Sequence, residues 1–317
     1  MVKVSLIIPC YNARPYIDKC MSAILEDELT DKELIFINDG SSDDTLTILK
    51  KYKKKYDNIV IIDQENSGQA VARNKALDIA KGNYIFFLDV DDYIEKDAIK
   101  KMYEYAEKNK YDYVCCDYYE HYNDRDIVIS NYRSDDLKKN AIVANFAPWG
   151  KIISKKLIDK IHFRFCEGKI FEDIAVIPHL AACAKNPGYL QEPLIYYNMT
   201  NMSTTRQKEY KKKFEDIIYI SDYVYKLFSD DKLIDDYREE LKYIYLEGMI
   251  RTGVLKFANY NEGIKNIRVL RKNVKDKFSH LLNNKYYKQE SFYRKLTGFV
   301  AVYFHPRVIR LLKKIKG

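Results

Sequence analysis

Residues 84–92 read YIFFLDVDD, a run of hydrophobic side chains followed at once by acidic ones. Five hydrophobic residues in succession are typical of a strand that is buried on both faces, as in a parallel sheet. Asp89, Asp91 and Asp92 then place three carboxylates within four residues, where their like charges repel one another. The stretch therefore predicts a core strand over 84–88 that ends in an acidic loop.

Strand and helix patterns alternate around this stretch. Short apolar runs predict further strands over residues 4–9, 33–39, 59–62 and 113–116. Helical spacing predicts helices over about 15–27, 43–56, 68–81 and 96–108. Ser67 is expected to cap the third of these helices, and Gly82 to follow its last turn. Buried strands alternating with helices predict an α/β fold, a mostly parallel sheet with helices on both faces.

The second half of the chain has a different pattern. Residues 120–205 are less regular, with a loop around Trp149, a helix that opens at Glu172 and runs to about residue 184, and a strand over 189–197. From about residue 206 onward the spacing is helical to the end of the sequence. We therefore expect a domain over residues 1–205 and a helical tail over residues 206–317.

The predicted parallel topology gathers polar side chains from distant parts of the sequence. Short polar stretches follow the first four strands, at residues 9–12, 38–40, 66–68 and 89–92. Ligands of open α/β sheets bind outside the carboxyl ends of the strands. These four stretches are therefore expected to form one binding site.

Asp89, Asp91 and Asp92 suit a divalent metal ion. Mg²⁺ and Mn²⁺ prefer oxygen ligands that are shared between carboxylates and phosphate. A metal there would neutralise charge that builds up on a departing diphosphate. The alternative is an acidic loop that only caps the following helix.

Three other groups complete the predicted site. Asn66, Gly68 and Arg73 lie at the start of a helix, where backbone N–H groups and a guanidinium suit phosphate; an ordinary cap with a surface ion pair is the alternative. Asp39 can accept a hydrogen bond from a nucleotide base or ribose, or it can be a turn residue. Asp173, in the first turn of a helix, can act as a general base. The alternative is that Asp173, like Glu172, only stabilises the helix by interacting with its dipole.

Charge is distributed unevenly along the 317 residues, which carry a net charge of +8. Residues 205–317 have 26 basic and 14 acidic residues, a net +12, so the remainder is −4. Residues 265–317 have 15 basic and 2 acidic residues, a net +13. This basic end indicates an anionic partner, either a membrane surface or nucleic acid.

The tail also has apolar residues at helical spacing. They are Phe292, Leu296, Phe299, Val300 and Tyr303, and after Pro306 come Val308, Ile309, Leu311, Leu312 and Ile315. Such a basic amphipathic segment can lie on an anionic membrane and bring the chain to a lipid-linked substrate. The alternative is a helical appendage that packs on the first domain or on a second subunit, as in a homo-oligomer.

The sequence also predicts the cellular location of the protein. The six cysteines form no C-x-x-C pair, and the five histidines have no metal-binding spacing, so free thiols in a reducing cytosol are expected. The first residues lead directly into a strand, and no apolar run is long enough to span a membrane. We expect a cytoplasmic protein, held at the inner face of the membrane if the tail binds there.

Four motifs in the same order resemble glycosyltransferase family 2, the inverting enzymes of the GT-A fold. They are VSLIIPCYN at 4–12, INDGSSDDT at 37–45, NSGQAVARN at 66–74 and GNYIFFLDVDD at 82–92. Trp149-Gly150-Lys151 and Glu172-Asp173 resemble the later signatures of that family. The resemblance implies a transfer of a sugar from a nucleotide sugar, most often a UDP-sugar, to a hydroxyl of a glycan or lipid-linked acceptor, as in bacterial surface polysaccharide synthesis.

The resemblance also implies a role for each candidate residue. Pro9, Tyr11 and Asp39 match positions that hold the base, and Asn66 and Arg73 match base and phosphate contacts. Asp89 and Asp91 match the D-x-D pair, with Asp91 the direct ligand of Mn²⁺ or Mg²⁺ and Asp89 nearer the ribose. Asp173 matches the catalytic base, with the neighbouring Glu172 as the alternative. Trp149 is expected to pack under the acceptor site, and residues 197–203 resemble a loop that folds over the diphosphate.

Three alternatives belong to other classes. A nucleic-acid-binding protein would use the basic tail, but it leaves the ordered acidic and glycine motifs unexplained, and we expect no nucleic acid. A sugar-phosphate nucleotidyltransferase would have a Gly-rich loop after the first strand, and residues 9–12 contain no glycine. A degenerate family member would bind a nucleotide sugar without catalysis.

Overall fold

The structure is a computed structural model that describes residues 1–200 and 209–309. The chain forms two compact units, one of Met1–Gly168 with Cys183–Asn201 and one of Lys169–Ala182 with Met202–Gly317. The second unit thus includes residues 169–182, which the expected boundary near 205 assigned to the first domain. Each unit is described by itself below.

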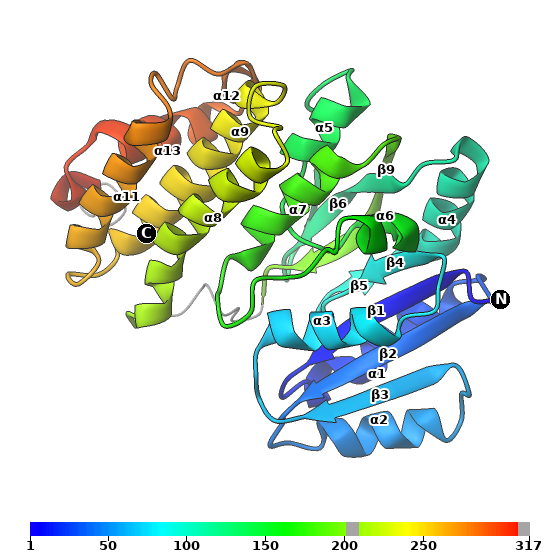
Figure 1. The fold of residues 1–317 in the computed structure, drawn as a ribbon. Coiled ribbons are helices and arrows are strands. Elements are labelled where there is room, and N and C mark those ends of the chain that lie inside the picture. The colour runs from blue at the N-terminus through cyan, green and yellow to red at the C-terminus, as the bar shows by residue number, and fades with distance from the viewer. Residues whose placement is uncertain (201–208, 310–317) are drawn as a thin grey trace. The chain divides into compact units, whose positions relative to one another are not determined.

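The first unit is built on a single mixed sheet (Figure 1). Its strand order is β3-β2-β1-β4-β8-β6-β9-β5, and β7 pairs with β6. The predicted parallel arrangement is confirmed for β3, β2, β1 and β4, while β8 joins both β4 and β6 antiparallel. The strands are β1 (Val4–Cys10), β2 (Lys32–Asp39), β3 (Ile59–Gln64), β4 (Tyr84–Phe87), β5 (Tyr93–Ile94), β6 (Tyr113–His121), β7 (Asp126–Ile129), β8 (Lys151–Ser154) and β9 (Pro187–Asn198).

Helices cover both faces of this sheet, which confirms the predicted α/β class. On one face Leu6 and Ile8 of β1 join a core with Ile17, Met21 and Ile24 of α1. Helix α3 packs on β1 and β2 from the other face. The helices of this unit are α1 (Arg14–Glu26), α2 (Thr45–Lys53), α3 (Gln69–Ile79), α4 (Ala98–Asn109), α5 (Leu137–Val143) and α6 (Lys155–Lys160).

The second unit is helical, as predicted for the tail. A π-helix, η2, lies at its centre and contacts α8, α9, α11 and α13. Ten consecutive residues of π-helix are unusual, since this geometry normally lasts a single turn. The elements are α7 (Glu172–Cys183), η1 (Lys212–Glu215), α8 (Asp216–Asp230), α9 (Arg238–Ile244), η2 (Tyr245–Val254), α10 (Leu255–Phe257), α11 (Ile264–Lys277), α12 (Lys285–Gln289) and α13 (Phe292–Tyr303).

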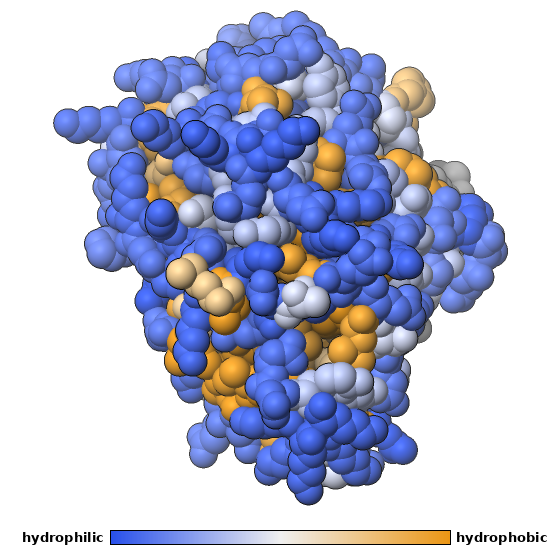
Figure 2. Space-filling view, turned by 90° about the vertical axis from the view of Figure 1, so that its right-hand side faces the viewer, coloured by the Kyte–Doolittle hydropathy of each residue, from blue (hydrophilic) through white to orange (hydrophobic). Residues whose placement is uncertain are grey.

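Hydrophilic side chains dominate the face shown in Figure 2, with hydrophobic patches among them. None of the described helices is both long and apolar enough to cross a membrane. The six cysteines all lie among the described residues and are thiols outside any disulfide, as expected. Residues 201–203 of the predicted loop and residues 310–317 of the predicted amphipathic segment lie outside the described residues.

Two predictions about the ends of α3 are wrong. The N-cap is Gly68, and the Ser67 hydroxyl instead donates to the carbonyl of Glu65 at 2.9 Å. The helix ends at Ala80 in an extended conformation, so Gly82 lies beyond its cap. Gly82 is needed for packing, because a Cβ there would lie 2.4 Å from the backbone nitrogen of Ser5 in β1.

This close approach predicts that Gly82→Ala destabilises the fold. A methyl group at 2.4 Å from backbone must push β1 and β4 apart, at a cost of about 1–3 kcal/mol of unfolding free energy. Urea denaturation measures the loss. The exposed neighbour Lys81, replaced by Ala, should change stability by less than about 0.5 kcal/mol. Equal stability of the two variants would contradict the packing argument.

Candidate active site

The carboxylate of Asp39 joins two of the predicted loops. It is the last residue of β2 and is buried. One oxygen accepts from the Gln64 side chain and the backbone N–H of Ser67, both at 2.7 Å, and the other accepts from the backbone N–H of Gly68 at 2.9 Å. Asp39, which was predicted to bind a base or ribose, therefore also holds the start of helix α3 against the end of β2.

Gly40 allows these loops to touch. Its φ is +68°, a conformation that glycine adopts readily, and a Cβ would lie 2.5 Å from the backbone nitrogen of Asn66. The side chain of Asn66 is exposed at this contact. The 38–40 and 66–68 stretches thus meet, as the parallel topology predicted.

Helix α3 extends this connection to the acidic loop. Arg73 lies on its second turn, and its Nη2 is 2.8 Å from Oδ1 of Asp89. The guanidinium also lies over the ring of Phe165, 5.2 Å from its centroid. Because Arg73 is only 2% exposed while the Asp89 side chain is 25% exposed, the carboxylate is the more accessible member of the pair.

The remaining acids are organised by the end of β9. The backbone N–H of Asn198 donates to Asp92 at 2.8 Å, and its side-chain amide donates to the carbonyl oxygen of Asp91 at 3.2 Å. Asp92 is buried, whereas the Asp91 side chain is half-buried. These bonds fix the backbone at the acidic loop, and the buried Asp92 contributes to this through its side chain.

The first predicted stretch ends at the same edge of the sheet. β1 runs parallel to β2 and β4, with Cys10 beside Asn38 and Ile7 beside Phe87. Pro9 is buried within the strand, and the Tyr11 side chain beyond it is 56% exposed. Asn12 accepts from the backbone N–H of Ser42 at 2.9 Å, which joins the β1 and β2 loops.

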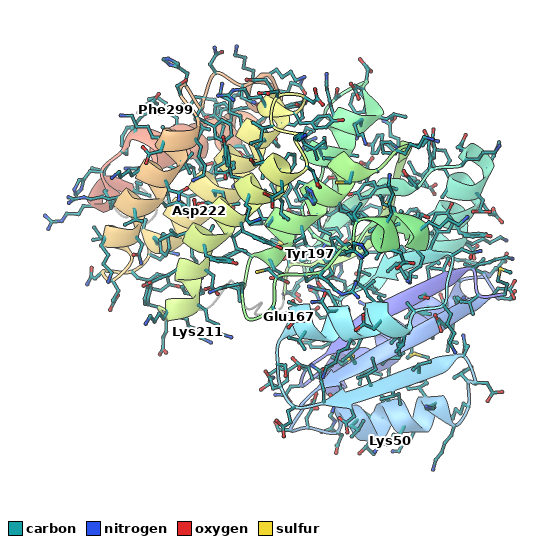
Figure 3. All side chains as sticks on the ribbon, viewed as in Figure 1. Lys50, Glu167, Tyr197, Lys211, Asp222 and Phe299 are labelled. Carbon is teal, nitrogen blue, oxygen red and sulfur yellow. The ribbon has the colours of Figure 1, made fainter. Side chains whose placement is uncertain are left out.

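An aromatic cluster lies beside this edge. Trp149 forms a bridge with Phe87, stacks on Tyr197 with ring centroids 5.2 Å apart, and meets Tyr118 edge to face. Trp149 is buried. Tyr197 is labelled in Figure 3. The cluster ties the end of β4 to β9, next to the acidic loop.

Comparison with known proteins identifies the family. Residues 5–177 match the family model described as Glycosyl transferase family 2. The chain belongs to this family. The match includes all four motifs except the first residue of the first one, and also Trp149, Glu172 and Asp173.

Individual relatives agree with this family assignment. The chain is 29% identical over 251 residues to the putative glycosyltransferase EpsH of Bacillus subtilis, covering 75% of this chain and 72% of EpsH. It is 30% identical over 224 residues to the glycosyltransferase GlyA of Streptococcus pneumoniae, covering 64% of this chain and 32% of GlyA. The chain therefore spans about a third of the length of GlyA.

A solved structure shows the same fold. The crystal structure of S. aureus TarS residues 1–349 in complex with UDP-GlcNAc has a TM-score of 0.68, with 19% sequence identity. The likeness covers 99% of this chain and 92% of TarS 1–349. It confirms the GT-A-type fold of this family 2 chain together with its C-terminal helical region.

The predicted base lies in the second unit. Glu172 and Asp173 form the first turn of α7, after Phe171 with a φ of +64°. Oδ1 of Asp173 is 2.9 Å from the backbone nitrogen of Ile174, while Glu172 is buried. Since Asp173 and the acidic loop belong to different units, their approach remains a prediction.

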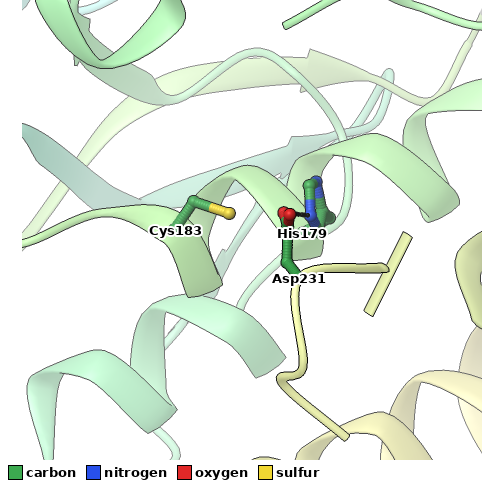
Figure 4. A group of neighbouring side chains, drawn as sticks. All are labelled: His179, Cys183 and Asp231. Carbon is green, nitrogen blue, oxygen red and sulfur yellow. Dashed lines mark hydrogen bonds and ion pairs between the residues drawn. The ribbon is translucent and has the colours of Figure 1, made fainter. Parts of the chain in front are cut away.

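Helix α7 is attached within its own unit by a histidine. Nε2 of His179 lies 2.7 Å from Oδ2 of Asp231, the residue that ends α8 (Figure 4). Burial lowers the pKa of His179 below its ordinary value, although the hydrogen bond to Asp231 opposes that shift. Cys183, the last residue of α7, is drawn beside them in Figure 4. The histidine thereby links α7 to the C-terminal end of α8.

Two partners in this site could not be predicted from the sequence. Asn198 lies in the predicted 197–203 loop, but its bonds to Asp91 and Asp92 join residues more than a hundred positions apart. Phe165 had no recognisable sequence signal, and it lies about ninety positions from Arg73. Gln64 had a weak signal, because a parallel β2–β3 pair in this register places it beside Asp39. Sequence spacing alone cannot reveal such long-range partners.

The hydrogen bonds of Asp39 predict a stability effect for Asp39→Asn. An amide has one oxygen, so its NH₂ group would face a backbone N–H of Ser67 or Gly68 and leave it unsatisfied. We expect a loss of about 1–3 kcal/mol of unfolding free energy, measured by urea denaturation. As a control, Asp57→Asn changes an exposed aspartate and should have almost no effect. An unchanged Asp39→Asn protein would refute this role.

Proposed function

We propose that this chain is a metal-dependent, inverting glycosyltransferase that moves a sugar from a nucleotide sugar to a hydroxyl of a glycan or lipid-linked acceptor. The main support is one continuous set of contacts in the first unit. Asp39 binds the N-terminus of α3, and Arg73 of the same helix binds Asp89. Loops that are distant in sequence thereby form one site at the carboxyl ends of the parallel strands, where such sheets bind ligands.

The nucleotide would bind at the ends of β1 and β2. The exposed ring of Tyr11 offers an aromatic face to a base, and Asn66 is exposed beside Gly40. Asp39, whose two oxygens hold the β2 and α3 loops, would fix the base-binding edge. We infer a UDP-sugar, in line with the UDP-GlcNAc bound by TarS.

Phosphate binding would depend on the start of α3. Gly68 has a φ of +90°, and nothing lies within 4 Å of the position where its Cβ would be. A helix N-terminus with this open approach suits an anionic diphosphate. Arg73 is almost completely buried, so we propose that it acts mainly by orienting Asp89, with its charge adding to the field at the phosphates.

The acidic loop fits Mn²⁺ or Mg²⁺ by its chemistry. Asp89 and Asp91 offer carboxylate oxygens from partly exposed side chains, and hard divalent ions prefer such ligands. A bound metal would neutralise charge on the leaving diphosphate. Arg73 would hold the carboxylate of Asp89 in position for it, and Asn198 would hold the backbone of Asp91.

Asp173 would remove the proton from the acceptor hydroxyl. A carboxylate in the first turn of α7 is stabilised as the anion by the helix dipole. The acceptor oxygen then attacks the anomeric carbon opposite the leaving diphosphate, so the configuration inverts without a covalent enzyme intermediate. Trp149, buried beside Tyr118 and Tyr197, would form an aromatic platform under the acceptor.

A donor-hydrolysis screen tests this function. UDP-, GDP-, CDP- and dTDP-sugars are incubated with the protein and Mn²⁺ or Mg²⁺, and release of the nucleoside diphosphate is measured. We expect turnover with a UDP-sugar that EDTA abolishes. Asp91→Ala should lower it by roughly a hundredfold or more, because an uncompensated diphosphate is a poor leaving group.

Asp57→Ala is the matched control, since this exposed aspartate precedes β3 at the opposite end of the sheet. Its turnover should equal that of the unaltered protein. Metal-dependent nucleotide binding without turnover would identify a catalytically degenerate family member. The proposal is overturned if the protein shows no binding and no turnover with any of the donors.

A second pair of variants tests the base. Asp173→Asn should lower transfer to an acceptor by roughly 10²–10⁴-fold, because the acceptor hydroxyl loses its proton acceptor. Donor binding, measured by calorimetry, should not change. Glu172→Gln is the matched change on the adjacent residue and should have a small effect. A larger loss in Glu172→Gln would assign the base to Glu172.

A further inference from the structure

Helix α13 packs into the second unit through its small side chains. Gly298 and Ala301 are buried, and a Cβ on Gly298 would lie 2.8 Å from the ring of Tyr287. The side chain of Val300 is also buried. The side of the helix that faces its own unit is therefore lined mainly by small residues.

The large apolar side chains of the same helix are exposed. Phe292 is 80% exposed, Leu296 47%, Phe299 45% and Tyr303 62%, and Phe299 is labelled in Figure 3. Their spacing of four, three and four residues places them along one side of the helix. We call these four residues the outer stripe. Single exposed apolar residues are common, but a continuous row of this size indicates a contact surface.

Hydrogen bonds that do not involve the outer stripe hold both ends of helix α13. The Ser291 hydroxyl caps its first turn by accepting from the backbone N–H of Arg294. At the other end, the Arg271 guanidinium donates to the carbonyl oxygens of Ala301, at 2.9 Å from Nε, and Phe304, at 2.8 Å from Nη2. The outer stripe is thus presented on a helix whose two ends are already fixed.

The segment that carries the outer stripe is basic in sequence, and one of its cations, Arg294, is paired with Glu247 at 3.4 Å and Glu290 at 3.6 Å. Residues 291–317 contain seven basic residues, which are Arg294, Lys295, Arg307, Arg310, Lys313, Lys314 and Lys316, and no acidic residue. Among the described ones, Arg307 is exposed and Lys295 half-buried. An exposed apolar row in a basic segment complements a surface that is apolar inside and anionic at its edge.

We propose that the outer stripe inserts into an anionic lipid bilayer, with α13 lying in the plane of the interface. Twelve residues of helix measure about 18 Å, too short to span the hydrocarbon core. Aromatic side chains such as Phe292, Phe299 and Tyr303 suit the boundary between headgroups and acyl chains. The basic residues add electrostatic attraction to the headgroups.

Two other binding partners fit the outer stripe less well than a lipid surface does. A second copy of this chain packed face to face would bring the basic segments of the two copies together, which costs free energy. A nucleic acid would complement the charge, but its phosphates would leave Phe292, Leu296 and Phe299 without an apolar partner. A lipid surface satisfies the charge and the apolar stripe at once.

Vesicle flotation of the full chain tests the proposal. We expect flotation with vesicles of phosphatidylcholine mixed with phosphatidylglycerol, little flotation with phosphatidylcholine alone, and weaker binding at high salt. The joint change Leu296→Asp with Phe299→Asp should lower the partition coefficient by roughly tenfold or more, because it removes two inserted apolar side chains. Phe292→Ser, at a side chain that is 80% exposed, should weaken binding without disturbing the fold.

The matched control is Leu25→Asp, since Leu25 of α1 is 41% exposed and lies outside the tail. It should float like the unaltered protein. Circular dichroism checks that every variant is folded, and donor hydrolysis should be unchanged in all of them, so failure here is distinct from failure of the proposed enzyme. The proposal is overturned if the unaltered chain does not float, if the stripe variants float equally well, or if light scattering shows a dimer that the stripe variants dissociate.

Discussion

The Asp39 carboxylate accepts hydrogen bonds from Gln64, Ser67 and Gly68, and the site of the first unit depends on this arrangement. A buried carboxylate is costly unless its oxygens are satisfied. Two of the three donors here are the backbone N–H groups of Gly68, the N-cap of α3, and of Ser67 before it. One side chain therefore fixes the start of this helix against the end of β2.

The position of α3 in turn determines where Asp89 lies. Arg73 lies on the same helix as Gly68, and its guanidinium reaches the loop after β4. A nearly buried arginine is stable only when its charge is balanced, so the carboxylate of Asp89 is held at a defined point. The acidic loop is fixed from its other side by Asn198 of β9. The proposed metal and phosphate positions thus follow from contacts between three separate segments.

The second unit is distinguished by which side chains it buries and which it exposes. Its centre is the buried π-helix η2, and α13 covers part of it with small residues while the larger apolar side chains face outward. A helix whose only task was to complete a core would bury Phe292 and Phe299 and expose its smaller residues. The reversed arrangement, in a segment with no acidic residue, is the basis of the proposed contact with an anionic lipid surface.

The sequence by itself determined the alternating strands and helices of the first half, because solid apolar runs and helical spacing are local signals. It also identified Asp39, Arg73 and Asp89 as members of one site, since parallel strands bring their carboxyl ends to one edge. Both ends of α3 were misjudged, because the roles of Ser67 and Gly82 depend on how closely the helix and β1 approach their neighbours. Only the tertiary structure could show that Asn198 binds Asp91 and Asp92, that Phe165 joins the site, that Arg73 is buried against Asp89, and that α13 turns its large side chains outward. Each of these depends on contacts between residues far apart in the chain, and burial is a property of the folded packing that no local pattern fixes.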